Sequence, residues 1–210
     1  MERRNYDMKF EVRSNEEGNQ EVVGYAAIFN SDSVKIGGKF VEIIEERAFD
    51  EVINDDVVAL FNHDQSKVLG RTSAGTLKLS LDKSGLQYRY IDPQTSYSKD
   101  LLISIDRGDI KGSSFGFAEV TDKWYRRDDG VVVRSISKIG KLGDVSPVTS
   151  PAYETTSVFK RYNEFIDTEQ REEKTEETKT EIPEEIKEEI KEIKTPNRNV
   201  RELQLSIGLA

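Results

Sequence analysis

Short runs of alternating apolar and polar residues fill most of the chain between Gln20 and Tyr162. Successive side chains of a strand point to opposite faces, so this period of two predicts strands that each bury one face. Glycine or Asp-Gly-type turns separate the runs. The predicted strands are EVVGYAAIFN, KFVEIIE, DVVALFNH, GTLKLSLD, GLQYRYID, SSFGFAEVTDKWYRR and GVVVRSISKIG. Closely spaced strands of this kind are typical of a barrel or a sandwich.

Three segments carry a helical pattern instead. They are ERAFDEVIN (residues 46–54), SYSKDLLISIDRGD (96–109) and TTSVFKRYNEFI (155–166). The second segment places Leu101, Leu102 and Ile105 on one side, and Gly108 is its expected C-terminal stop. Helices packed on an antiparallel barrel of such strands would give an α+β, β-rich class.

After about Glu164 the chain consists almost entirely of Glu, Lys and Thr, which predicts a disordered or solvated segment. Within it, Ile182, Ile186, Ile190 and Ile193 recur at helical spacing, and Pro183 sets the expected helix start. This spacing indicates either an amphipathic helix with a binding partner or a solvated charged helix with one apolar stripe. The predicted domains are an N-terminal arm (1–19), a folded domain (20–163) and an acidic tail (164–210) with a short helix at 183–194.

The composition narrows the class of protein. With 210 residues and 35% hydrophobic composition, the chain can bury the core of one ordinary domain and carry an appendage. A formal net charge of -9 argues against a nucleic acid or an anionic membrane as partner. No apolar run approaches the length of a membrane span, and the basic N-terminus lacks the apolar core of a signal peptide. We therefore expect a soluble cytosolic protein.

The residues that the chain lacks narrow its chemistry. It has no cysteine, which excludes disulfides, thiolate nucleophiles and cysteine-based metal sites. It has one histidine, His63, which must supply any imidazole base. A metal site would need mostly carboxylate ligands, and the sequence shows no recognisable cluster of them. We expect no cofactor.

The stretch KGSSFGF raises the question of serine chemistry. Gly112, Ser114 and Gly116 match G-x-S-x-G, the turn that presents a nucleophilic serine in α/β-hydrolases. That turn leads from a strand into a helix, and its histidine follows the serine; here the strand pattern continues and His63 lies upstream. Taken singly, His63 could be a partly exposed strand-end residue and Ser114 a small residue in a glycine-rich strand. The segment DVSPVTSPAY, which begins at Asp144, could be a rigid exit loop in which the prolines stop sheet pairing.

Together, these segments resemble the prohead proteases of tailed bacteriophages. The resemblance runs from VVGYAAIFN, through ALFNHDQSKVLGR and KGSSFGF, to VSPVTSPAYETTSVFKR, and covers about Val22 to Arg161. It implies a serine endopeptidase domain with a fold similar to that of the herpesvirus assemblins, a β-barrel surrounded by helices.

The resemblance also implies roles for individual residues. The histidine of the family's NHD motif is His63, the general base and then general acid, and the serine of its SFGF motif is Ser114, the nucleophile. Ser113 is the weaker candidate, because the family often has an apolar residue there. The family usually has an acidic residue, commonly glutamate, just before S-x-V-T-x-P-A-Y, and here that position is Asp144.

The partners follow from the same resemblance. The substrates would be the scaffolding protein or the scaffolding segment of the major capsid protein, together with the protease itself, inside the immature phage head in the host cytoplasm. A homo-oligomer is left open. The acidic tail would either dock the protease during assembly or be a disposable extension. The oxyanion donors also stay open, with the amides around Gly143 to Val145 and the side chains of Arg71 and Arg134 as candidates.

Two rival functions remain at this point. One is a non-enzymatic β-barrel protein of capsid assembly or scaffold binding, which would tolerate the loss of His63, Ser114 and Asp144. The other is a metal-dependent hydrolase built on Asp, Glu and the one histidine, which the absence of a ligand cluster in the sequence disfavours.

Overall fold

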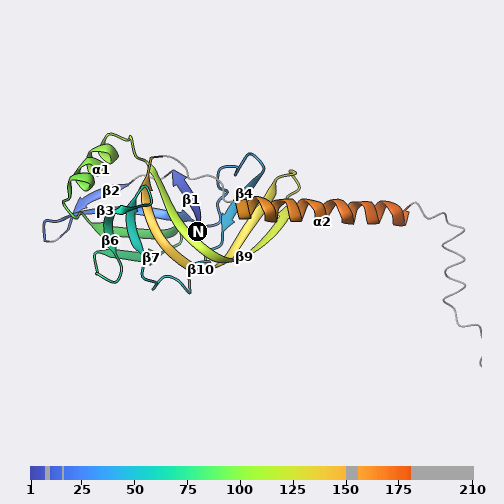
Figure 1. The fold of residues 1–210 in the computed structure, drawn as a ribbon, viewed down its shortest axis with the longest axis horizontal. Helices are drawn as coiled ribbons and strands as arrows, with labels where there is room; N and C mark the ends of the chain where they lie inside the picture. The colour runs from blue at the N-terminus through green and yellow to red at the C-terminus, as the bar shows by residue number, and fades with distance from the viewer. Residues whose placement is uncertain (8–9, 16, 150–155, 181–210) are drawn as a thin grey trace, which may run out of the picture. The chain divides into compact units, whose positions relative to one another are not determined.

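The computed structural model describes residues 1–7, 10–15, 17–149 and 156–180, which form ten strands and two helices (Figure 1). The elements are β1 (Glu2–Asp7), β2 (Glu11–Ser14), β3 (Gln20–Ile28), β4 (Phe40–Ile44), β5 (Val58–Phe61), β6 (Asp64–Arg71), β7 (Leu77–Leu81), β8 (Gly85–Ile91), α1 (Ser96–Asp106), β9 (Gly112–Arg126), β10 (Val132–Val148) and α2 (Thr156–Thr180). The predicted α+β, strand-rich class is confirmed.

The strands form two sheets, and the larger one contains the long pair β9 and β10, which run side by side in Figure 1. One sheet has the order β1-β9-β10-β5-β6, with β4 also paired to β10, and the other has the order β2-β3-β8-β7. Both β4 and β5 run parallel to β10, one at each end of it, so the strands are not all antiparallel as predicted. Within the described residues, the ladders form these two sheets and no closed barrel.

The hydrophobic core takes side chains from both sheets. The rings of Phe115 and Phe117 on β9 stack with their centroids 4.8 Å apart. The ring of Phe49 meets that of Phe115 edge-on, with 5.4 Å between the centroids. Tyr88 and Leu86 of β8 belong to the same cluster. Because strand side chains alternate, the residues next to Phe115 and Phe117 on β9 point to the other face of the sheet.

The three predicted helices differ in outcome. The segment 46–54 forms consecutive turns rather than a helix. These turns bury Phe49 and Val52 while the chain returns from β4 to β5. The second prediction is confirmed as α1, whose N-cap Thr95 accepts a hydrogen bond from the Ser98 N–H at 3.3 Å. The third is confirmed as α2, which continues to Thr180. No helix in the described part of the chain is long and apolar enough to cross a membrane.

The domain boundaries stay predictions, and the helix expected at 183–194 lies outside the described residues. The chain divides into two units, Met1–Phe159 and Lys160–Ala210. Strands β1 and β2, which lie in the segment predicted as an arm, pair with β9 and β3, respectively.

A buried cluster of charges links β1 to β4 and β10 within the six-stranded sheet. Arg134 contacts Glu2 at 2.6 Å, Glu42 at 2.9 Å and Asp122 at 2.5 Å. Arg4 contacts Glu2 at 2.8 Å and also pairs with Glu42. The side chains of Arg134 and Glu42 are fully buried, so the loss of one partner would leave a buried charge uncompensated.

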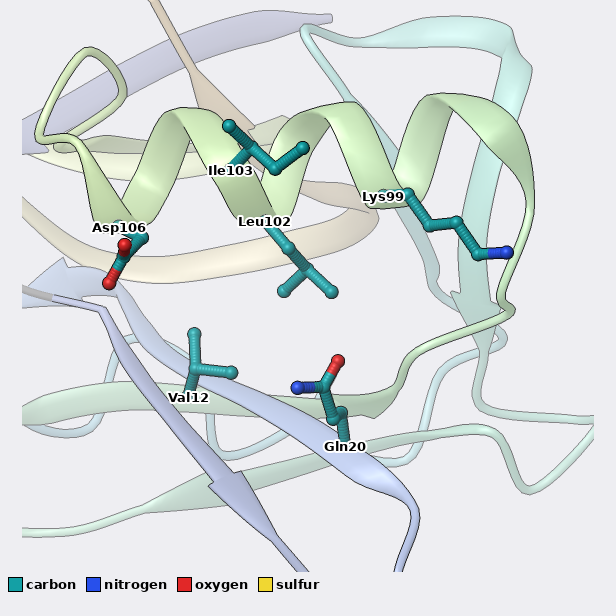
Figure 2. Close-up of a pocket in the computed structure, with 6 residues that line it drawn as sticks. All are labelled: Val12, Gln20, Lys99, Leu102, Ile103 and Asp106. Carbon is teal, nitrogen blue, oxygen red and sulfur yellow. The ribbon is translucent and has the colours of Figure 1, made fainter.

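A groove of about 390 Å³ lies between α1 and the strands β2 and β3 (Figure 2). Leu102 of α1 points into it toward Val12 of β2, and Lys99 and Asp106 lie toward its two ends. The lining residues are Val12, Gln20, Lys99, Leu102, Ile103 and Asp106. None of them belongs to β9 or β10, so the groove is separate from the chemistry that those two strands carry.

Candidate active site

Strand alternation on β9 separates the two adjacent serines. Ser113 points into the core, where its hydroxyl donates a hydrogen bond to the Tyr88 hydroxyl at 2.9 Å. Burial raises the pKa of Tyr88 despite this hydrogen bond, so Tyr88 stays neutral. Ser114 points to the opposite face, where its Oγ lies 2.7 Å from Nε2 of His63. Of the two serines, it is therefore Ser114 that faces the histidine.

Strand β10 brings two polar side chains to the face that carries Ser114. Asp144 and Ser146 pair with Gly116 and Ser114 of β9, respectively. A β-bulge interrupts the ladder just before Asp144. Gly116 leaves open the space opposite Asp144, and a Cβ there would overlap the Asp144 carboxylate. The spacing of two residues on each strand thus places both hydroxyls and the carboxylate on one face.

His63 lies in a two-residue turn between β5 and β6, two positions beyond the last residue of β5. Both turn residues, Asn62 and His63, have positive φ, 55° and 57°, as a type I′ hairpin turn requires. The Asn62 N–H donates to the carbonyl of Pro147 at 3.0 Å, and the Thr149 N–H donates to Oδ1 of Asn62 at 2.9 Å. These bonds hold the turn against the end of β10. Sheet pairing continues through Pro147, so the prediction that this proline stops it is wrong.

The three side chains predicted as a triad lie in hydrogen-bond contact. Nδ1 of His63 forms a short hydrogen bond with Oδ1 of Asp144, and Nε2 of the same ring lies 2.7 Å from Oγ of Ser114. The exposed fractions are 8% for His63, 5% for Asp144 and 0% for Ser114. Water therefore competes little with these hydrogen bonds.

This arrangement is suited to nucleophilic catalysis by a serine. A hydroxyl needs a base within hydrogen-bond reach, and the base needs a third group that orients it. When Nδ1–H of His63 donates to Asp144, Nε2 keeps the lone pair that can accept the proton of Ser114. Strands β9 and β10 and the β5–β6 turn each supply one of the three groups.

A comparison with protein families decides which class of protein carries this site. The family model described as caudovirus prohead serine protease matches residues 8–171, well over half of the chain. The chain belongs to this family. It is accordingly a serine peptidase of bacteriophage capsid maturation.

The prohead protease is also similar to a solved structure, that of the bacteriophage T4 capsid assembly protease, gp21. The two share 14% sequence identity at a TM-score of 0.47, over 70% of this chain and 96% of that chain. No curated protein matches the chain.

The two arginines considered as oxyanion donors of the prohead protease are both paired with carboxylates. Arg71 contacts Asp56 at 2.6 Å, and its hydrogen bond lowers the pKa of Asp56 to about 2. Arg134 belongs to the buried charge cluster. Burial by itself would lower the pKa of Arg134, but the hydrogen bond and charge of Glu2 and the charge of Glu42 raise it. We propose neither arginine as an oxyanion donor.

Sequence reasoning missed the roles of three residues in this site. Ser146 follows Asp144 by two positions, so the period of two by itself could have placed both on one face. Asn62 precedes His63, and asparagine is among the residues that most readily adopt a positive φ. The fit between Gly116 and Asp144 had no local signal, because it depends on the register between two strands. Among the described residues, no three His, Asp or Glu side chains are grouped to hold a metal ion.

Proposed function

We propose that this prohead protease cleaves the scaffolding protein, or the scaffolding segment of the major capsid protein, and also itself. His63, Ser114 and Asp144 are the catalytic residues of this proposal. The observation that carries it is the buried chain of hydrogen bonds from Asp144 through His63 to Ser114 in a member of this family. The site of action is the assembling head inside the host cell.

The reaction follows from the positions of the three groups. Ser114 Oγ attacks the carbonyl carbon of the peptide bond while Nε2 of His63 takes its proton. Asp144 stabilises the imidazolium that forms, because Nδ1–H points at its carboxylate. The tetrahedral intermediate then loses the amine, which takes the proton from Nε2. Water, activated by the same nitrogen, hydrolyses the acyl-enzyme and restores Ser114.

Family membership favours this enzyme over the two rival functions. A non-enzymatic assembly protein would have no use for a buried serine, histidine and carboxylate in hydrogen-bond contact. The proposed similarity to the herpesvirus proteases rests on the family resemblance. The same resemblance is the only ground for a homo-oligomer. Because Ser114 is fully buried, substrate entry would require the surrounding chain to move.

The test is to co-express the chain with its capsid and scaffolding proteins and to follow the intact masses of all chains over time. Wild type is expected to trim the capsid or scaffolding protein and itself. Ser114→Ala and His63→Ala should lower the rate by several orders of magnitude, on the order of 10⁶-fold when triad members act together.

Ser113→Ala is the matched control, because it removes the neighbouring hydroxyl from the core and leaves the hydrogen-bond chain intact. It should process like wild type, with some loss of stability from the unpaired Tyr88 hydroxyl. Undiminished processing by folded Ser114→Ala would refute the catalytic assignment. A wild type that cleaves itself but neither capsid nor scaffolding protein would refute the proposed substrates.

A further inference from the structure

Oδ1 of Asp144 accepts two hydrogen bonds, and one of them comes from outside the proposed triad. The first is the short bond from Nδ1 of His63. The second comes from the Ser146 hydroxyl at 3.0 Å. Ser146 is fully buried and pairs with Ser114 across β9 and β10. A buried hydroxyl thus sits at the junction of the acid and the base.

The hydroxyl of Ser146 has one proton and two lone pairs. Its proton is directed to Asp144, and its Oγ also lies 3.3 Å from Nδ1 of His63. A lone pair of Ser146 therefore faces the ring. Both oxygens beside Nδ1, Oδ1 of Asp144 and Oγ of Ser146, are then acceptors, an arrangement that is favourable when Nδ1 carries the proton.

We propose that Ser146 is a positioning residue that holds His63 in the tautomer with its proton on Nδ1. The inference rests on the proposed function, in which Nε2 of that tautomer accepts the proton of Ser114. Without the hydroxyl, the Asp144 carboxylate loses a donor that fixes its rotation, and Nδ1 loses one of its two acceptors. Ser146 acts through Asp144 and His63, so its loss lowers kcat and leaves KM nearly unchanged.

The first experiment is ¹⁵N NMR of the full chain labelled at histidine, which reports on His63 alone because the chain has one histidine. Ser146→Thr keeps the hydroxyl, whereas the valine of Ser146→Val has nearly the shape of threonine but no hydroxyl. In wild type and Ser146→Thr, the two nitrogen shifts should place the ring proton of His63 on Nδ1. In Ser146→Val the two nitrogen shifts should move toward each other, as the tautomer with the proton on Nε2 becomes populated.

Two spectral outcomes would overturn the proposal. One is a Ser146→Val spectrum identical to that of wild type. The other is an equal change in the Thr and Val variants, which would assign the effect to the added methyl group. The spectra need no substrate, so inactivity of the wild type would count against the proposed function while the tautomer is still tested.

Kinetics provide the second measurement. Ser146→Val should have a kcat about 10- to 100-fold below that of Ser146→Thr, the range expected for losing a hydrogen bond to a charged group. In an Asp144→Ala background this difference should change in size, because Ser146 and Asp144 act on the same ring nitrogen and their effects are not independent. A difference of unchanged size there, or one that appears in KM, would mean a packing role and contradict the proposal.

Discussion

The absence of a side chain at Gly116 makes room for Asp144. The two residues pair across β9 and β10, and a Cβ at Gly116 would overlap Oδ2 of the carboxylate. The φ of Gly116 lies outside the left-handed region, so alanine would cause no backbone strain there. This glycine of the G-x-S-x-G match thus accommodates the carboxylate, whereas in a hydrolase elbow it serves a sharp turn.

We expect Gly116→Ala to displace the Asp144 carboxylate and to lower kcat/KM by about 10²-fold, as a misplacement of about 1 Å can do. Steady-state kinetics on a peptide substrate would measure this loss. Chemical denaturation provides the control: the alanine should destabilise wild type more than it destabilises Asp144→Ala, which has no carboxylate to displace. Equal destabilisation in both backgrounds would show that the overlap is relieved elsewhere.

At the scale of elements, the hairpin between β5 and β6 presents the base. Its two turn residues both adopt positive φ, and the second of them is His63. A non-glycine residue in this conformation is strained, and such strain persists where surrounding structure over-determines it. Here the surrounding structure is β10, which binds the turn through Pro147 and Thr149. The ring of His63 is thereby aimed at both Asp144 and Ser114.

Two substitutions of Asn62 separate backbone strain from the side-chain bond to Thr149. Asn62→Gly adopts the positive φ without strain and loses the amide oxygen, whereas Asn62→Ala loses the amide oxygen and must also hold the positive φ with a Cβ. We expect Asn62→Ala to be less stable than Asn62→Gly by about 1–2 kcal/mol, the cost of a left-handed conformation for a residue with a Cβ. Urea unfolding of the two variants would measure the difference. Equal stabilities would argue that the turn relaxes to another conformation.

For the whole molecule, the buried charges tie the N-terminal strand to the sheet that carries the nucleophile. Glu2 and Arg4 of β1 meet Arg134 of β10 and Glu42 of β4. The same strand pairs with residues 112–117 of β9, with Asn5 opposite Ser114. The stability of the strand that holds Ser114 is therefore coupled to the ionisation of these groups.

This coupling predicts an acid-dependent loss of stability. Burial by itself would raise the pKa of Glu2, but the hydrogen bond and charge of Arg134 and the charge of Arg4 lower it below 4.5. A lowered pKa in the folded state stabilises above the unfolded value and is lost as pH falls through the folded value. Glu2→Gln should therefore reduce stability at pH 7 and flatten its decline below about pH 4.5. Denaturant unfolding at several pH values, compared with wild type, would measure this; parallel curves for the two proteins would contradict it.

The alternation of apolar and polar residues predicted seven strands, but it did not predict β1, β2 or β6. All four residues of β2 are exposed, so no apolar face marks this strand. The segment 46–54 has the composition of a helix and forms turns, because β4 and β5 must both reach β10 in parallel and Phe49 must enter the core. A local pattern carries no information about either requirement.

The sequence by itself determined the chemistry available to this protein: one imidazole, no thiol, and a serine motif on a strand. Together with the family resemblance, it also pointed to His63, Ser114 and Asp144. The tertiary structure decided which serine faces the histidine, and it added the roles of Ser146, Asn62 and Gly116. The sequence could not show these contacts, because His63 lies 51 residues from Ser114 and 81 from Asp144 along the chain. Contacts at such separations depend on strand register and turn geometry, which a pattern repeating every two residues does not encode.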